Sequence, residues 1–252
     1  MRKILALLLI ICCCLSVVSC KDKTGDNNPN AASKSDLQHF VDMFAASAPK
    51  KSEATTTIFA NNIELISTYT LTTGTVGGKA ASVFESVVTT LNDVENDQGN
   101  LNEKTTKKTT YYYLEGKGTR TNKGKWKADG VDFAPEAGDI YLDLNKNYFS
   151  RTEYYETESA ETLVLYIDED LNETNGYAKK VLARFIPQDQ PFGYETKITI
   201  TATGGRISRI LINCIDYEHF IGDEYDPVTI SDAKLTIDVK YSYNIELDID
   251  FE

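Results

Sequence analysis

The sequence predicts a mainly β, α+β fold: a large, strongly curved antiparallel sheet, an incomplete barrel, with an N-terminal amphipathic helix packed on it. Three observations support this fold class. Apolar and polar residues alternate through most of the chain after residue 60, as in strands with one solvated face. Short turn-forming clusters separate these runs. Only one stretch shows the three- and four-residue spacing of an amphipathic helix.

The expected helix lies directly before this β-rich region. Ser35 or Asp36 can cap its N-terminus, and Pro49 ends the pattern. Its apolar stripe consists of Leu37, Phe40, Val41, Phe44, Ala45 and Ala48. We expect this stripe to pack against the sheet.

The alternating runs predict ten or eleven strands. They are residues 63–71, 81–91, 109–115, 119–127, 140–144, 148–155, 161–167, 178–186, 194–203, 206–215 and 235–251. Gly77-Gly78 reads as a turn, and the acidic, amide-rich residues 92–104 read as a loop. Hairpins are expected around residues 116–118, 145–147 and, most clearly, Gly204-Gly205.

The last strand has the most regular pattern. Apolar or aromatic residues occupy every odd position from Leu235 to Phe251. At ~3.3 Å per residue such a strand would be about 55 Å long, so we expect it to curve or bend near residues 242–244.

The predicted sheet has more apolar surface than the helix can cover. A helix of about 14 residues is only ~21 Å long. The sheet could close on itself as a barrel or sandwich, loop segments could cover it, or an apolar guest could occupy it. The candidate cover segments are residues 129–138 and 216–228.

The N-terminus has the pattern of an export signal. Arg2 and Lys3 precede an apolar run of 15 residues, which is shorter than the about 20 that a membrane-spanning helix needs. The run ends in Val17-Val18-Ser19-Cys20, which resembles the bacterial lipobox. That resemblance implies cleavage before Cys20 and diacylation of its thiol. The alternative is an ordinary signal peptide in which this cysteine is accidental.

These segments predict three regions. Residues 1–19 form a lipoprotein signal peptide, residues 20–35 a lipidated flexible tether, and residues 36–252 a single β-rich domain. Two acyl chains are enough for durable anchoring. We therefore expect the domain to be attached to the bacterial cell membrane or envelope, on the exported side, through a diacylglycerol anchor.

The order of these features resembles the lipoprotein-carrier superfamily, which includes the LppX and LprG type of lipid-binding lipoproteins. The shared order is a lipobox, a polar tether, a helix ending in Ala46-Ser47-Ala48-Pro49, and then long antiparallel strands. The resemblance implies an incomplete barrel with helices at its mouth and an apolar cavity for acyl chains. It assigns a role to no residue of the β-rich domain.

Composition and motifs argue against other classes of function. The formal net charge is −12, and we expect no segregated basic patch and no nucleic-acid binding. Cys214 would be the only cysteine left besides Cys20, so no intrachain disulfide is expected, and a buried thiol is favoured over a nucleophile. The chain shows no catalytic or metal-ligand motif, so we expect no enzyme, no resident metal and no cofactor.

Two further patterns have simple structural explanations. The acidic residues 168–176 could hold a cation, but an EF-hand would need glycine and glutamate where Glu173 and Lys179 stand, so a solvated turn is favoured. The 15 tyrosines could form a platform for glycans or peptides, but packing at strand boundaries is the favoured explanation.

The leading hypothesis is a noncatalytic, membrane-anchored lipoprotein that binds an amphipathic molecule, such as a lipid, between the sheet and the helix. The candidate lining residues are Phe40, Phe44, Leu165, Leu211, Ile237, Val239, Tyr241 and Tyr243. The main alternative is a surface interaction module, a sandwich without a cavity that binds a protein or glycan. A degenerate enzyme or a calcium binder is the third option.

Overall fold

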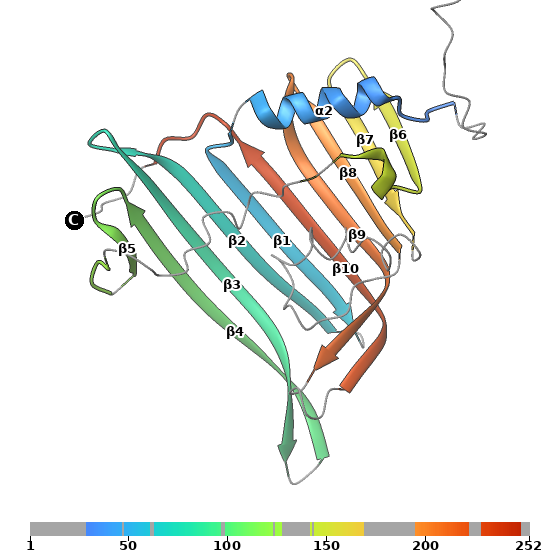
Figure 1. The fold of residues 1–252 in the computed structure, drawn as a ribbon. Coiled ribbons are helices and arrows are strands. Elements are labelled where there is room, and N and C mark those ends of the chain that lie inside the picture. The colour runs from blue at the N-terminus through green and yellow to red at the C-terminus, as the bar shows by residue number, and fades with distance from the viewer. Residues whose placement is uncertain are drawn as a thin grey trace, which may run out of the picture. The chain divides into compact units, whose positions relative to one another are not determined.

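The computed structural model describes residues 29–46, 48–60, 63–96, 99–122, 124–127, 142, 144–168, 195–221 and 228–247. The chain divides into two compact units, Met1–Ala31 and Ala32–Glu252. The second unit contains the helix and the sheet (Figure 1).

The described residues form one α-helix, ten strands and a short 3₁₀ helix. These are α2 (Lys34–Ala46), β1 (Lys51–Ala60), β2 (Ile63–Val76), β3 (Lys79–Asn96), β4 (Gly99–Leu114), β5 (Gly118–Thr121), η1 (Lys146–Tyr148), β6 (Arg151–Glu156), β7 (Glu161–Ile167), β8 (Glu195–Thr203), β9 (Arg206–Ile221) and β10 (Val228–Ser242).

All ten strands belong to one antiparallel sheet with the order β5-β4-β3-β2-β1-β10-β9-β8-β7-β6. The sheet is not closed, which confirms the predicted fold class. Strands β1 and β10, from the two ends of the domain, pair at its centre. The two edge strands, β5 and β6, are consecutive in the chain, so the residues between them connect opposite edges of the sheet.

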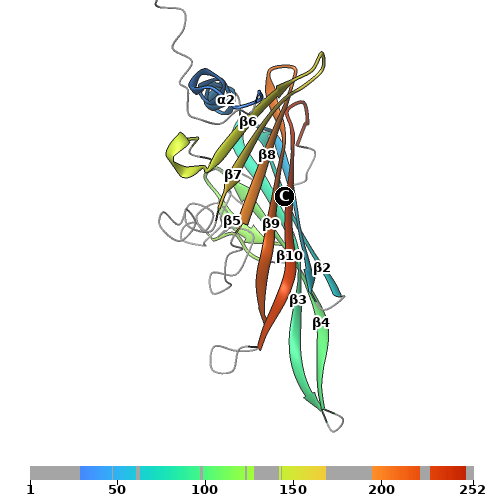
Figure 2. The same cartoon turned by 90° about the vertical axis from the view of Figure 1, so that its right-hand side faces the viewer.

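Helix α2 confirms the predicted helix, but Ser33 caps it rather than Ser35 or Asp36. The Ser33 amide donates to Asp36 Oδ2 at 2.7 Å, and the Asp36 amide donates to Ser33 Oγ at 3.3 Å. This reciprocal arrangement has the geometry of a capping box. The helix buries Leu37, Phe40 and Met43 and lies on one side of the sheet (Figure 2).

Both edges of the sheet are capped by short backbone contacts. The Ala32 amide donates to the Thr152 carbonyl on β6 at 3.0 Å. On β5, Thr119 and Lys127 exchange two backbone hydrogen bonds of 3.1 and 2.8 Å. These contacts occupy edge groups that could otherwise pair with another chain.

The predicted glycine turns are confirmed. Gly204 and Gly205, with φ of 59° and 72°, join β8 to β9. A two-residue turn with both φ values positive matches the twist of a hairpin, and glycine adopts it without strain. Gly77 and Gly78, with φ of 58° and 77°, play the same part between β2 and β3.

Two predictions about the N-terminal half were wrong. Strand β1 was not expected, because Lys51–Ala60 begins with a polar, threonine-rich stretch. Residues 92–104 were expected to be a loop, yet they pair from Asn92 with Glu103 to Asn96 with Gly99. Continuation of the β3–β4 ladder outweighs the weak strand preference of their acidic and amide side chains.

The C-terminal half also departs from expectation in three places. The predicted 140–144/148–155 hairpin is absent from the described residues, where Lys146–Tyr148 is η1 and β6 pairs with β7. Residues 216–221 belong to β9 rather than to a cover segment. The last strand ends at Ser242, with bends at residues 243–244, at the point where a bend was expected. Residues 129–138 and 178–186 lie outside the described part.

Candidate functional site

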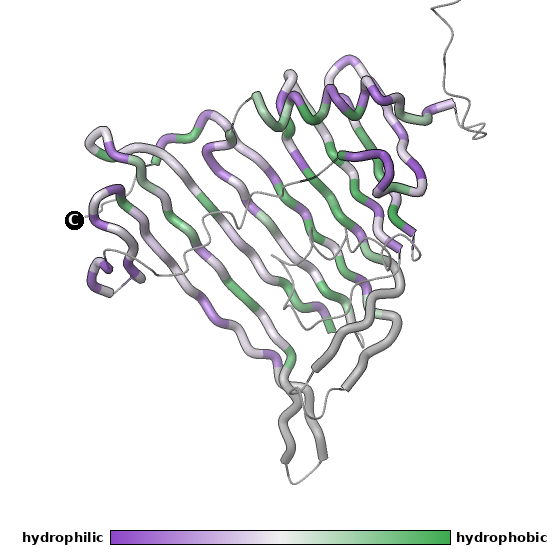
Figure 3. The backbone as a smooth tube through the Cα atoms, in the orientation of Figure 1, coloured by the Kyte–Doolittle hydropathy of each residue, from purple (hydrophilic) through white to green (hydrophobic). Residues whose placement is uncertain are grey.

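One face of the sheet, called the core face here, carries three rows of cross-strand partners that run from β7 to β2. The first row is Leu163, Ile200, Ile210, Val239, Ala54 and Tyr69. The second is Leu165, Ile198, Ile212, Ile237, Thr56 and Ser67. The third is Ile167, Thr196, Cys214, Leu235, Ile58 and Leu65. The rows are most apolar on β7–β10, where Thr196 is the one polar member (Figure 3).

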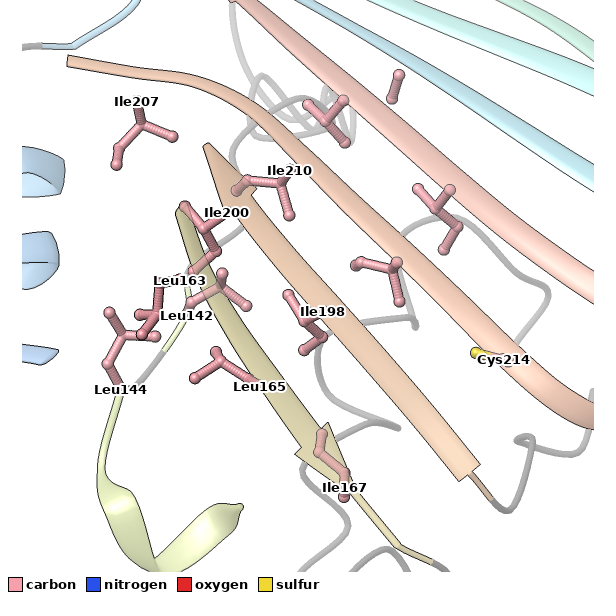
Figure 4. Packing of buried hydrophobic residues seen from close by; sticks show 14 of the residues in the cluster. Leu142, Leu144, Leu163, Leu165, Ile167, Ile198, Ile200, Ile207, Ile210 and Cys214 are labelled. Carbon is pink, nitrogen blue, oxygen red and sulfur yellow. The ribbon is translucent and has the colours of Figure 1, made fainter. Parts of the chain in front are cut away.

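Described residues from outside the sheet pack against these rows. Helix α2 contributes Leu37, Phe40 and Met43, and the connection between β5 and β6 contributes Leu142 and Leu144. Leu142 lies beside Leu163 (Figure 4). The connection between the edge strands therefore supplies part of the cover.

The structure brings together most of the predicted lining residues. Leu165, Ile237 and Val239 lie on the core face with no exposed surface, and so does Phe40 from α2. Phe44 and Tyr241 are half-buried against the same cluster. These six residues belong to one apolar surface.

Leu211 is not part of that surface. It lies between Ile210 and Ile212 on β9 and pairs with Thr199 and Asp238, so its side chain is on the opposite face. Residues 210–212 are all apolar, so alternation alone could not show which of them points inward.

Tyr243 lies just beyond the end of β10. Its hydroxyl donates to the Ile207 carbonyl at 2.7 Å, and the Arg206 guanidinium lies 5.2 Å from its ring centroid. Burial raises the pKa of Tyr243, although Arg206 opposes the shift. These contacts tie the end of β10 to the start of β9.

Thr56 was missed by the sequence analysis and is the unusual member of the core face. Its side chain is 2% exposed, and its Oγ1 has no hydrogen-bond partner among the described residues. The next residue in the row, Ser67, accepts a hydrogen bond from the Thr89 amide at 3.0 Å. A buried hydroxyl without a partner costs stability and is available to a polar group of a ligand.

A polar contact at the start of β7 holds helix α2 in place. His39 Nε2 lies 2.8 Å from Glu161 Oε2, and the Tyr154 hydroxyl donates to the same oxygen at 3.2 Å. The Phe40 and Tyr154 rings meet edge to face at 6.4 Å. Burial and the carboxylates of Glu161 and Glu156 raise the pKa of Tyr154 to about 12. The contact makes His39 a positioning group for the helix.

Cys214 is a free cysteine buried on the core face, as the sequence predicted. Its sulfur lies 3.7 Å from Thr196 Oγ1. Burial raises the pKa of the Cys214 thiol to about 12. The thiol is therefore protonated at physiological pH and poorly suited to nucleophilic chemistry.

We expect Cys214 to resist alkylation in the native protein. A pKa of about 12 rather than the ordinary 9.0 lowers the thiolate fraction near pH 8 about a thousandfold. In the chain comprising residues 21–252, iodoacetamide labelling followed by mass spectrometry should be at least a thousandfold slower in buffer than in urea. Equal rates would show that the core face opens freely.

A pocket of about 210 Å³ lies at the end of β7 and the start of β8. It is lined by Ser150, Arg151, Tyr166, Ile167, Asp168, Glu195, Thr196 and Lys197. The Arg151 guanidinium stacks on the Tyr166 ring at 3.9 Å, and Lys197 Nζ lies 5.6 Å from the same ring. The pocket is smaller than the ~300 Å³ typical of small-molecule sites. Its lining contains both acidic and basic side chains, so it favours neither an anionic nor a cationic ligand.

Basic residues are segregated, contrary to the sequence-based expectation. Residues 104–127 contain eight lysines and arginines but one acidic residue, Glu115, in a chain of net charge −12. Apart from Lys123, which is outside the described residues, they lie on β4, β5 and the adjoining turns, at one edge of the sheet. The patch is therefore visible in the sequence itself, as a local run of cations within a chain whose overall charge is negative.

The described part of the chain contains neither a metal-binding cluster nor a membrane-spanning helix. There, no group of three or more His, Cys, Asp and Glu side chains could hold a metal ion. No helix among the same residues is long and apolar enough to cross a bilayer. Of the acidic stretch 168–176, the structure describes only Asp168.

Comparison with known proteins gives no family assignment. No protein-family model and no curated protein matches the chain. A crystal structure of a DUF1329 family protein from Desulfovibrio piger aligns over 84% of this chain and 93% of its own, at 10% identity and a TM-score of 0.24. A "putative outer membrane lipoprotein-sorting protein domain" from Vibrio parahaemolyticus aligns over 83% and 93%, at 10% identity and a TM-score of 0.22. Neither likeness is close enough to carry an argument about this chain.

Proposed function

We propose that this chain is a noncatalytic lipoprotein that is anchored to the envelope membrane through a diacylglycerol on Cys20. Its proposed activity is to bind an amphipathic molecule, a lipid being the preferred class, on the core face beneath α2. The apolar part of the ligand would lie along the rows of β7–β10, and its hydroxyl or carbonyl group would reach Thr56.

The observation that carries the proposal is the orphan hydroxyl of Thr56 within an apolar face. Its row neighbour Ile237 has no exposed surface, and no atom in the described part of the chain pairs with Thr56 Oγ1. Buried polar groups in proteins are almost always paired. A ligand with one polar group and an apolar body would satisfy this hydroxyl and retain the apolar environment around it.

Entry of such a ligand requires the cover to move, because the core-face side chains are already packed. Helix α2 is the described element best suited to this movement. Its polar attachment, between His39 and Glu161, is on the surface, with the His39 side chain 51% exposed. The helix is 13 residues long, about 20 Å, and can rotate away without disturbing a strand pair.

The direct test is recovery of the ligand. Protein purified from its own host should release a lipid or similar amphiphile on organic extraction, and native mass spectrometry should show the corresponding added mass. Protein that carries no bound molecule, and binds none when mixed with lipids extracted from that host, would contradict the proposal.

The variant Thr56→Val tests whether the unpaired Thr56 hydroxyl contributes to ligand binding. It keeps the shape of the side chain and removes the unpaired hydroxyl, so the ligand-free protein should gain about 1 kcal/mol in free energy of unfolding. The amount of copurified amphiphile should fall by about fivefold to tenfold, because its polar group loses a partner. Urea unfolding and quantitative extraction measure the two effects.

Thr57→Val is the matched control, since Thr57 is the next residue on β1 and lies on the opposite face. It should change neither quantity. Equal ligand content in the wild type and Thr56→Val would remove Thr56 from the site.

A second candidate is a surface interaction module without a ligand cavity. The complete burial of Leu165, Ile212 and Ile237 favours it, because a filled core needs no guest. In that case extraction would recover nothing, and Thr56→Val would still stabilise the chain. The two readouts of the Thr56 experiment therefore separate the candidates.

A further inference from the structure

Five basic side chains meet at one corner of the sheet, where β3 begins and β4 turns into β5. This basic corner consists of Lys79, Lys117, Arg120, Lys125 and Lys127. The Lys79 ammonium is beside the β4–β5 turn, since a Cβ placed on Gly116 would lie 3.8 Å from Lys79 Nζ. The four lysines are exposed and Arg120 is half-buried.

None of these five cations forms an ion pair, as far as the described residues show. Elsewhere Arg209 binds Asp238 at 2.7 Å and Lys51 binds Glu53 at 2.8 Å. The nearby acid, Glu115, accepts a hydrogen bond from the Ala80 amide at 2.9 Å instead. Among the described residues, this corner therefore has no neutralising acidic partner.

Aromatic rings hold Arg120 and Lys117 in place. The Arg120 guanidinium lies 5.1 Å from the Tyr112 ring centroid and 5.0 Å from that of Trp126. Lys117 Nζ lies 5.7 Å from the Trp126 ring. Arg120 Nε is buried and forms no hydrogen bond with the residues that the structure describes. The ring contacts fix the cations without reducing their charge.

Protection of a sheet edge does not account for this corner. Edge strands often carry lysine to prevent pairing with other chains, and Lys104, Lys107 and Lys108 fit that role on the part of β4 that β5 does not cover. At the corner, however, β5 covers β4, and the Thr119–Lys127 backbone pair covers β5. The edge is already blocked where the five cations gather.

The basic corner and α2 lie at the same end of the sheet. Helix α2 leads into the start of β1, which pairs with the end of β2 next to the β2–β3 turn. His39 of α2 meets Glu161 at the start of β7, at that same end (Figure 1). A membrane that lies against this end of the sheet would therefore meet both the corner and the end that carries α2.

We propose that the basic corner docks the domain on the anionic headgroups of a phospholipid membrane, with Trp126 between Lys125 and Lys127 at the interface. Unpaired lysines provide the attraction to an anionic surface, and an amphipathic ring suits the headgroup level. This inference adds to the proposed function a contact that would bring the end of the sheet that carries α2 toward the bilayer. It requires neither the Cys20 anchor nor a bound ligand.

Flotation with vesicles tests the docking independently of the Cys20 anchor and of a bound ligand. The protein is the chain comprising residues 21–252, which lacks Cys20 and contains the whole compact unit Ala32–Glu252. It should bind vesicles of phosphatidylcholine with phosphatidylglycerol and not vesicles of phosphatidylcholine alone. Binding should fall steeply with salt, because the Debye length shortens from ~10 Å at 0.1 M to ~3 Å at 1 M.

Trp126 is the only tryptophan in the chain, so its fluorescence reports on the corner directly. Brominated lipid should quench it in the anionic vesicles alone. The triple variant Lys117→Gln, Lys125→Gln, Lys127→Gln should bind about a hundredfold less, from about fivefold for each cation.

The matched control is Lys146→Gln, Lys234→Gln, Lys240→Gln, which removes the same charge from positions outside the corner. It should retain wild-type vesicle binding. Equal loss in both triple variants, or no preference for phosphatidylglycerol, overturns the proposal. Binding to soluble heparin that depends on the corner lysines, without vesicle binding, overturns it in favour of a soluble polyanion.

Discussion

Replacing Phe40 with alanine should lower the free energy of unfolding by about 3–5 kcal/mol. Phe40 has no exposed surface, and its ring meets those of His39 and Tyr154 edge to face at 6.1 and 6.4 Å. The substitution removes the largest apolar contact of α2 and leaves a cavity between the helix and the sheet. Urea denaturation followed by circular dichroism measures the change.

The control is Val41→Ala on the same helix. Val41 is 37% exposed, so its loss should change stability by no more than about 0.5 kcal/mol. If Phe40→Ala also costs less than about 1 kcal/mol, α2 is not anchored as the structure shows. If Phe40→Ala unfolds α2 alone and leaves the sheet intact, the helix is a cover that opens on its own. Hydrogen exchange can separate this local unfolding from unfolding of the whole domain.

The sequence was most informative where local signals were strong. The apolar stripe around Phe40 gave the helix, and Gly204-Gly205 gave the β8–β9 turn. Alternation placed Ile237 and Val239 on the core face, as β10 shows. In these cases the spacing of the apolar side chains and the backbone geometry of the turn are compatible with only one local structure.

The missing information was in pairing between distant strands. Lys51–Ala60 becomes the central strand β1 because β2 and β10 pair with it on both sides, which its own threonine-rich sequence does not indicate. The orphan hydroxyl of Thr56 exists only in that environment. The basic corner is local for the most part, since four of its five cations lie within residues 117–127. The pairing of β3 with β4 adds Lys79, whose Nζ lies beside Gly116. The environment of Thr56 and the position of Lys79 therefore depend on the register of the sheet and not on a motif.

Replacing Cys20 with serine should abolish lipid modification of the exported chain. Mass spectrometry of the wild-type protein from its own host should show a chain that begins at Cys20 and carries a diacylglycerol. The Cys20→Ser protein should lack this added mass, whereas the control Cys14→Ser should keep it, because residue 14 is expected to leave with the signal. Diacylglycerol on the Cys20→Ser protein would contradict the proposed site.

The size of this effect separates the anchor from the basic corner. Two chains of about 15 methylenes contribute ~0.8 kcal/mol per methylene, or ~24 kcal/mol when fully buried. The corner cations contribute about 1 kcal/mol each, and salt screens them. Lipidated protein should therefore remain on membranes in 1 M salt, where the chain comprising residues 21–252 is released. If both are released, Cys20 carries no durable anchor, and if both remain, a contact other than the corner holds the domain.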